Sequence, residues 1–390
     1  MKSTSSINAQ YTLIVLKNKN ILDSIKDFFY QDLFHEIENI IHTDMDNIDT
    51  ALLKVNTRYV IVIQEGCFFY DHLVCNFIKP LDLDLEKYSL IGHILNREQT
   101  YYNLHEQCFA LNIEHWKKAG KPRFHDNTKT NLTSIIRSPD NFHDDYTPTW
   151  IKKDSQNNIH QEDVLKIKFG GFVISELLKN NFLIRPFNKQ ERTSKKFIYY
   201  TEQEQIANLI EWKNLNHNHK LYFPYTTKPS TIEFDQKASQ YISVAVAPES
   251  LLRINKVYKN INKIKYYDIS ITALIFTELF IKKFENHYIN FVEDFQALIP
   301  EKHHKFKPAG YNLEYEKIKP VLDHIRNNNV ETKYLIGDIT RNSVLEDLNK
   351  DTIINFTNVF TYQKNLIRKE ERDLYLEKLN NNVKIKQILM

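Results

Sequence analysis

Glycine is scarce in this chain, with only seven residues among 390. Globular proteins usually contain ~7% glycine, so the share here is about a quarter of the ordinary one. Glycine reaches backbone conformations that are closed to other residues. Each of these few glycines is therefore expected where the backbone geometry requires one.

Cysteines and long apolar runs are also few. The three cysteines, Cys67, Cys75 and Cys108, are odd in number and form no Cys-x-x-Cys pair. This pattern argues against a disulfide scaffold or a structural zinc site and fits a reducing cytoplasm. No apolar run approaches the ~18 residues of a membrane span, and the N-terminal sequence MKSTSSINAQ lacks the apolar core of a signal peptide. We therefore expect a soluble, cytoplasmic protein with no membrane partner.

The chain lacks an excess of charge of either sign, because 52 basic and 49 acidic residues give a net charge of +3. So balanced a charge neither supports nor excludes a nucleic acid as acceptor. Hydrophobic residues make up 42% of the chain and aromatic residues 13%. This is the composition of a globular protein, and the length is sufficient for two domains with cores of their own.

Apolar periodicity predicts an α/β protein of two domains, residues 1–228 and 229–390, with the boundary in a segment punctuated by Pro224 and Pro229. In the first domain we expect strands at residues 11–16, 59–63, 88–95 and 108–113, and helices at 21–34, 48–55 and 162–184. Residues 127–158 are polar and irregular and are predicted to be an extended loop.

Polar residues gather where three of these predicted strands begin or end. Glu65 and Gly66 follow the strand at 59–63, His93 lies late in the strand at 88–95, and His105-Glu106-Gln107 precede the strand at 108–113. In open α/β sheets, ligands bind outside the carboxyl ends of the strands. The sequence therefore predicts a binding site formed by these residues.

This arrangement resembles the nucleotide-sugar-binding fold of GT-A glycosyltransferases over residues 10–125, and the stretch FALNIEHWKKAGKP is similar to a strand–helix unit of that family. The resemblance implies a nucleotide-diphosphate sugar as donor, a hydroxyl group as acceptor and a divalent cation, Mn²⁺ or Mg²⁺. The family's acidic Asp-x-Asp motif is replaced here by Gln64-Glu65-Gly66. This replacement leaves three alternatives. Metal binding is weakened and other residues supplement it, or the protein does not depend on a metal, or the chain is a relative that no longer transfers sugars.

A loop bounded by Pro139 and Pro148 contains His143, Asp144 and Asp145. A histidine beside two carboxylates supplies a metal ligand, a general base or both. The resemblance implies that Asp144 or Asp145 deprotonates the acceptor and that His143 joins Glu65 on the metal.

A basic segment, residues 188–196, contains Arg192 and Lys195. These two side chains are candidates to hold a diphosphate or a nucleic-acid backbone. A solvated face is the alternative for this segment.

In the second domain, strands predicted at 241–247, 263–268, 333–338 and 354–360 alternate with helices, as in a Rossmann-like sheet. The spacing is similar to that of S-adenosylmethionine-dependent methyltransferases and implies that Asp268 binds the ribose and Asp338 lies on the adenine side. The first strand, however, runs into Ala247-Pro248-Glu249-Ser250 where a glycine-rich loop is expected. We therefore expect this domain to keep the fold rather than the cofactor.

Several of these candidate site residues also have a structural interpretation. Glu65 could bond to loop amides, His93 could be a core histidine, and Asp268 could cap the helix that begins near Ser270. The favoured function is glycosyl transfer. The alternatives are an S-adenosylmethionine-dependent methyltransferase and a non-catalytic binding or assembly protein.

Overall fold

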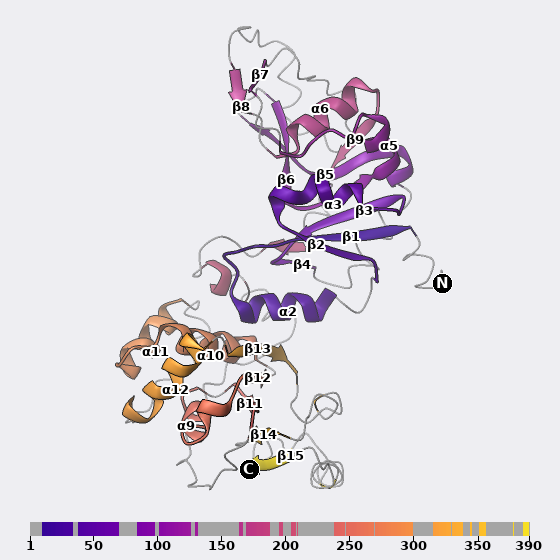
Figure 1. The fold of residues 1–390 in the computed structure, drawn as a ribbon. Coiled ribbons are helices and arrows are strands. Elements are labelled where there is room, and N and C mark those ends of the chain that lie inside the picture. Colours follow the sequence, from indigo (N-terminus) through magenta and orange to yellow (C-terminus); the bar gives the residue numbers. More distant parts are fainter. Residues whose placement is uncertain are drawn as a thin grey trace, which may run out of the picture. The chain divides into compact units, whose positions relative to one another are not determined.

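A computed structural model describes residues 10–33, 38–69, 84–97, 101–125, 129–131, 164–166, 169–187, 195–197, 204–207, 209, 238–245, 247–268, 270–298, 315–328, 330–337, 344, 351–355, 377 and 385–389. The chain divides into two compact units (Figure 1). Unit 1 comprises residues 1–20 and 32–198, and unit 2 comprises residues 21–31 and 199–390. The predicted boundary near residue 228 lies outside the described residues.

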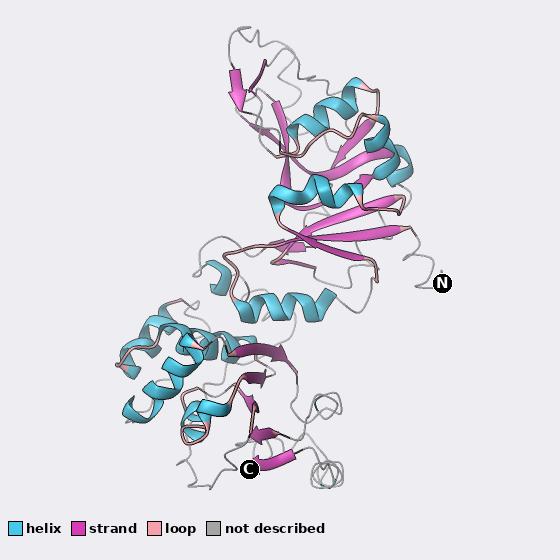
Figure 2. Ribbon diagram, viewed as in Figure 1, coloured by secondary structure: helices cyan, strands magenta, loops and turns pink. Residues whose placement is uncertain are grey.

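Unit 1 contains a mixed sheet of six strands in the order β2-β1-β3-β6-β5-β9 (Figure 2). The strands are β1 (Tyr11–Leu16), β2 (Ile40–Thr43), β3 (Tyr59–Gln64), β5 (Tyr88–Arg97), β6 (Tyr101–Asn112) and β9 (Leu183–Pro186). β1 is parallel to β2 and β3, and β5 is parallel to β9. β6 runs antiparallel to both of its neighbours.

The core of unit 1 lies between this sheet and three helices, α3 (Ile48–Leu53), α5 (Ile113–Lys118) and α6 (Gly171–Lys179). Alternate residues of β3, Val60 and Val62, belong to the same buried cluster as Trp116 and Leu177. The other face of β3 is also buried, at Ile61 and Ile63. Burial on both faces explains why β1 and β3 are continuous apolar runs in the sequence.

Short elements complete unit 1. They are the 3-10 helix η1 (Met45–Asn47), the antiparallel pair β4 (Cys67–Phe69) with β10 (Lys195–Phe197), and the antiparallel pair β7 (Lys129–Asn131) with β8 (Val164–Lys166).

The last pair corrects two predictions. Residues 129–131 are a strand and not part of a loop, and residues 164–166 are a strand and not the start of a helix. The helix begins only at Gly171, because Gly170 takes a left-handed conformation with φ of 71°.

Unit 2 contains a parallel sheet in the order β13-β12-β11-β14-β15. The strands are β11 (Gln240–Val244), β12 (Lys263–Asp268), β13 (Glu331–Ile336), β14 (Thr352–Asn355) and β15 (Ile385–Leu389). The helical elements are α9 (Glu249–Arg253), η7 (Tyr258–Asn260), α10 (Ile271–Lys283), α11 (Tyr288–Ala297) and α12 (Tyr315–Asn327). Every residue of α10 from Ile271 to Ile281 is buried, as expected of a helix that is apolar on all sides.

One helix of unit 2 comes from far earlier in the chain. Helix α2 (Asp23–Leu33) follows β1 directly in the sequence, yet residues 21–31 belong to unit 2. Its apolar residues Ile25, Phe28 and Phe29 are buried. The chain therefore passes between the units three times, after residues 20, 31 and 198.

Candidate functional site

The carboxyl ends of β1 and β3 form a topological switch point in the sheet of unit 1. From β1 the chain continues to β2 on one side, and β3 lies on the other side of β1. Ligands of open α/β sheets bind outside such a point. The residues that follow the two strands are Lys17 and Asn18 after β1, and Glu65 and Gly66 after β3.

Glu65 is held firmly at this edge. Only 1% of the residue is exposed. Its backbone N–H donates to the Leu16 carbonyl over 2.9 Å, and its Oε2 atom accepts the Asn18 N–H over 2.8 Å. Gly66 follows with φ of 97°, a left-handed conformation that favours glycine. The carboxylate thus binds a loop amide, and at the same time it lies where a ligand is expected.

The polar residues His105, Glu106 and Gln107 of β6 lie where the pairing of β5 with β6 is irregular. Gly92 pairs with Phe109 and Ile94 pairs with Leu104. One residue of β5, His93, therefore faces a stretch of four on β6, residues 105–108. Extra residues in a strand re-aim side chains and are common beside active sites.

The same stretch borders the end of β3, because the β3–β6 ladder ends at the pair Ile63 and Cys108. His93, His105, Glu106 and Gln107 consequently lie at the sheet edge that carries Glu65. The structure places them within β5 and β6, whereas the sequence analysis placed residues 105–107 before a strand that begins at residue 108.

Two glycines allow this irregular backbone to pack closely. A β-carbon at Gly92 would lie 2.6 Å from Leu104 Cδ1, and one at Gly170 would lie 2.6 Å from Leu104 Cβ. Gly170 is required, because its φ is 71° and the close atom is a β-carbon. At Gly92 a side chain would force the flexible end of Leu104 to move. Leu104 can therefore fill the space beneath the polar stretch.

The two histidines of the edge stack, with ring centroids 5.6 Å apart and planes inclined by 14°. The Nδ1 atom of His105 lies 3.5 Å from Oε2 of Glu106. The His105 side chain is 13% exposed and that of Glu106 is 27% exposed, so both reach solvent. A histidine beside a carboxylate is suited to accept a proton, because the carboxylate stabilises the imidazolium that forms.

The last residues of the basic segment belong to β10, which pairs with β4, the strand that follows Gly66. β10 pairs antiparallel with β4, so that Lys195 lies opposite Phe69 and Phe197 lies opposite Cys67. This pairing brings the backbone of Lys195 toward the predicted site. Arg192 lies outside the described residues, as do His143, Asp144 and Asp145.

Sequence reasoning missed two residues, of which Asn18 lies at this edge and Arg185 lies toward the start of β5, at the other end of the sheet. Asn18 holds Glu65 through its backbone, and a backbone donor leaves no signal in the sequence. Arg185 in β9 has a side chain only 4% exposed, and its Nη2 atom lies 3.0 Å from Oδ2 of Asp84. A lone arginine inside the apolar stretch FLIRPF was the available signal.

In unit 2, Asp268 ends β12 and its Oδ1 atom accepts the Ser270 N–H over 2.8 Å. Ser270 in turn is the N-cap of α10, and its Oγ atom accepts the Ala273 N–H over 3.4 Å. Asp268 therefore orders the turn into this helix. Asp338 lies outside the described residues.

A buried ion pair takes the place of a glycine-rich loop after β11. Arg253 Nη2 lies 3.0 Å from Glu249 Oε1, with side chains 4% and 1% exposed. Burial raises the pKa of Glu249, and Arg253 opposes that effect. Nearby, Asn355 Nδ2 donates to the Tyr241 hydroxyl over 3.1 Å, and that hydroxyl donates to the Ser250 carbonyl over 3.0 Å. Side chains thus fill this end of the sheet.

A metal site is not formed by the described residues alone. Among them, no three His, Cys, Asp or Glu side chains are grouped as metal ligands. Glu65 is buried, and its Oε2 atom accepts the Asn18 N–H. Its predicted partner His143 lies outside the described residues, so the cation that the family resemblance implies stays a prediction.

No family model matches this chain, and no curated protein is significantly similar to it. Of the helices in the described parts of the chain, none has the length and apolar character needed to cross a bilayer.

Proposed function

We propose that the chain transfers a sugar from a nucleotide-diphosphate donor to a hydroxyl acceptor at the carboxyl edge of the unit 1 sheet. The observation that carries the proposal is the gathering of Glu65, His93, His105, Glu106 and Gln107 at one sheet edge, beside a topological switch point. Carboxylate, imidazole and amide groups are the side chains that bind sugar hydroxyls.

In the proposed reaction, the bond between the anomeric carbon and the diphosphate oxygen breaks, and its electron pair leaves with the nucleotide diphosphate. The acceptor oxygen bonds to the anomeric carbon and loses its proton to a base. His105 is suited to be that base, because the Glu106 carboxylate 3.5 Å away stabilises its protonated form. Asp144 or Asp145 remains the predicted base in the loop.

The first experiment is a thermal-shift screen of the full chain against nucleotide-diphosphate sugars, with and without Mn²⁺ or Mg²⁺. A ligand present at 100 times its Kd adds about 2.7 kcal/mol to the stability of the native state. A shift with one nucleotide sugar supports the proposal, and its dependence on a cation tests the metal prediction. The absence of any shift across the panel refutes it.

Variants then separate the roles. Glu65→Gln is expected to abolish the shift, whereas Glu86→Gln, an exposed glutamate of the same unit, leaves it unchanged. With an active donor–acceptor pair, His105→Gln should abolish release of the nucleotide diphosphate if His105 is the base. If Asp144→Asn or Asp145→Asn abolishes this release and His105→Gln does not, the base lies in the loop.

A methyltransferase is the second proposal, favoured by the strand order of unit 2. In chain order the strands of that sheet are third, second, first, fourth and fifth, which is the order of Rossmann-like sheets. The buried Glu249–Arg253 pair argues against it, because it occupies the place of the glycine loop. A thermal shift with S-adenosylmethionine alone would favour this function. A shift with a nucleotide sugar but no turnover would favour a binding protein.

A further inference from the structure

Helix α2 covers the outer edge of the parallel sheet in unit 2. Asp27 Oδ2 accepts the Tyr334 N–H and, one turn further along the helix, Gln31 Oε1 accepts the Ile336 N–H, each over 2.8 Å. Within the described part of the sheet β13 is the edge strand, so these two amides face away from β12. Four helical residues advance ~6 Å and two strand residues ~6.6 Å, so the spacings match. Two side chains of α2 thus take the place of a neighbouring strand.

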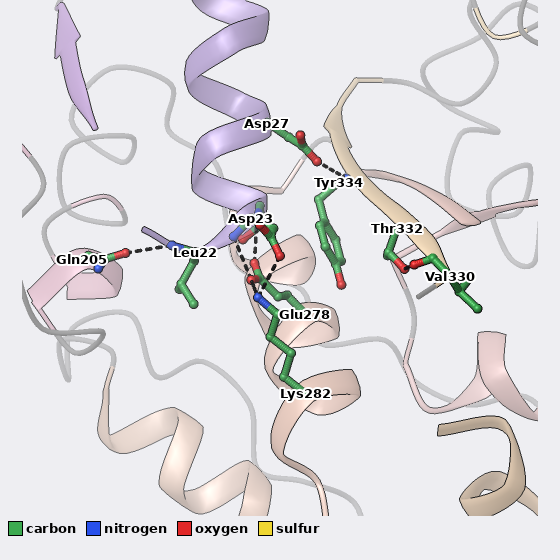
Figure 3. Close-up of polar contacts among 10 residues, drawn as sticks. Leu22, Asp23, Asp27, Gln205, Glu278, Lys282, Val330, Thr332 and Tyr334 are labelled. Atoms are coloured by element: carbon green, nitrogen blue, oxygen red, sulfur yellow. Dashed lines mark hydrogen bonds and ion pairs between the residues drawn. The ribbon is translucent and has the colours of Figure 1, made fainter. Parts of the chain in front are cut away.

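The start of α2 holds the buried carboxylate of Glu278, which belongs to α10. Figure 3 shows this carboxylate at the beginning of the helix, where its two oxygens accept the N–H groups of Asp23 over 2.8 Å and Ser24 over 2.7 Å. The Glu278 side chain is 0% exposed, and the Lys282 ammonium lies 2.6 Å from its Oε1 atom. Two amide donors at a helix N-terminus and an ammonium group all stabilise the negative charge of a carboxylate.

Asp27 adds a further negative charge to this place when it loses its proton. Asp23 precedes it by four residues on the same helix, and like charges at that spacing repel. The Lys282 ammonium is already shared between two carboxylates, 2.6 Å from Glu278 Oε1 and 2.8 Å from Asp23 Oδ2. The docked helix therefore places the Asp27 carboxyl near two carboxylates that have one ammonium between them.

The groups of β13 that face Asp27 only partly offset this repulsion. Lys333 attracts the Asp27 anion, but its side chain is 48% exposed, so solvent screens the attraction. Burial holds the pKa of the Tyr334 phenol well above its ordinary value of 10.0, so that ring stays neutral. The pKa of Asp27 itself is raised from 3.8 to about 6, chiefly by burial. Docked α2 thus carries a protonated Asp27 in acid and an ionised one at neutral pH.

We propose that α2 is a pH-sensitive cover of the β13 edge, which stays docked while Asp27 is protonated and opens locally when Asp27 is ionised. Opening brings the Asp27 carboxylate into water and leaves the Tyr334 and Ile336 amides without their acceptors on α2. The preference for the docked state is fully present below 3.8 and is lost as the pH rises through about 6. A helix of 11 residues is marginal without tertiary contacts, so α2 is suited to open while the sheet stays folded.

The test is hydrogen–deuterium exchange on the full chain at about pH 5 and about pH 7, corrected for the pH dependence of intrinsic exchange. The opening constant of the α2 amides and of the Tyr334 and Ile336 amides should rise about tenfold between these two values, as pKa values of 3.8 when open and about 6 when docked require. Asp27→Asn still offers an oxygen to the Tyr334 N–H, and its opening constant should not change with pH. Asp294→Asn, at an exposed position of α11, should keep the tenfold rise.

An opening constant that does not vary with pH in the natural protein would overturn the proposal, and so would an equal rise in Asp27→Asn. The β12 amides report global unfolding: if they exchange as fast as the α2 amides at both pH values, α2 does not open by itself and the cover is refuted. If Asp27→Asn does not fold, carbon-detected NMR of the natural protein gives the answer. The Asp27 carboxyl is then expected to titrate near pH 6, and titration near its ordinary pKa of 3.8 would overturn the proposal.

Discussion

The carboxyl group of Asp27 makes the stability of unit 2 depend on pH in a direction that can be stated in advance. Its pKa is raised from 3.8 to about 6, chiefly by burial; the Tyr334 amide and Lys333 act to lower it, and the nearby Asp23 and Glu278 carboxylates act to raise it. The native state therefore holds the proton more tightly than the unfolded chain. Its contribution to stability is fully present below 3.8 and is lost as the pH rises through about 6.

The size of the effect follows from the two pKa values. They differ by about 2 pH units, which corresponds to about 3 kcal/mol at 1.36 kcal/mol per unit. Asp27→Asn keeps an oxygen that accepts the Tyr334 N–H, but it removes the titrating group. The variant should therefore gain stability relative to the natural protein as the pH rises, by up to about 3 kcal/mol between about pH 4 and pH 7.

Equilibrium urea unfolding of both proteins, measured in parallel between about pH 4.5 and pH 7.5, tests this expectation, because the contributions of other groups cancel in the difference. Asp294→Asn, at an exposed position of the same unit, is the control and should give a difference that does not vary with pH. A flat difference for Asp27→Asn would refute the reasoning, as would a difference that grows toward acid pH.

Other substitutions test other parts of the structure. Gly170→Ala should lower the free energy of unfolding of unit 1 by more than about 2 kcal/mol, because the new side chain is both strained and overpacked. Gly120→Ala should lower it by about 1 kcal/mol, because φ is positive there but the surrounding space is open. Urea unfolding measures both effects. Arg253→Met should cost about 3–5 kcal/mol by leaving Glu249 buried without its partner, and Glu249→Gln/Arg253→Met should recover most of it in the same assay. Burial holds the pKa of His115 below 6.5, so its ring should titrate below that value by NMR, and its contribution to stability should be lost as the pH falls.

The sequence predicted best those strands whose burial is continuous. The expected bounds 11–16 and 263–268 are those of β1 and β12. β1 is a largely apolar run that ends before Lys17, whereas β12 contains Lys263 and Lys265 and ends at Asp268. β6 was predicted too short, since its polar stretch at residues 105–107 breaks the pattern although the strand continues. The helix expected at 162–184 was wrong at residues 164–166, which form β8, and at residues 183–184, which belong to β9. Gly170 is the N-cap of α6 and does not lie within the helix.

The candidate site was predictable only in part. The position of Glu65 after a buried strand follows from local pattern, but its partner Asn18 lies 47 residues away and is set by the pairing of β1 with β3. Helix α2 was predicted from its apolar period. Its polar side chains Asp27 and Gln31 have the appearance of a solvated face, and only the fold shows that they bond to an edge strand.

The distant origin of α2 has a consequence for how the chain folds as it is made. Asp27 and the Tyr334 amide that it binds are 307 residues apart. At ~5–20 residues per second, a ribosome needs about 15–60 s to synthesise that interval. An isolated helix of 11 residues is marginal in water. During this interval the residues of α2 cannot yet pack against unit 2, because its strands are not yet made. β1 and β2, which precede and follow α2 in the chain, can already pair with each other.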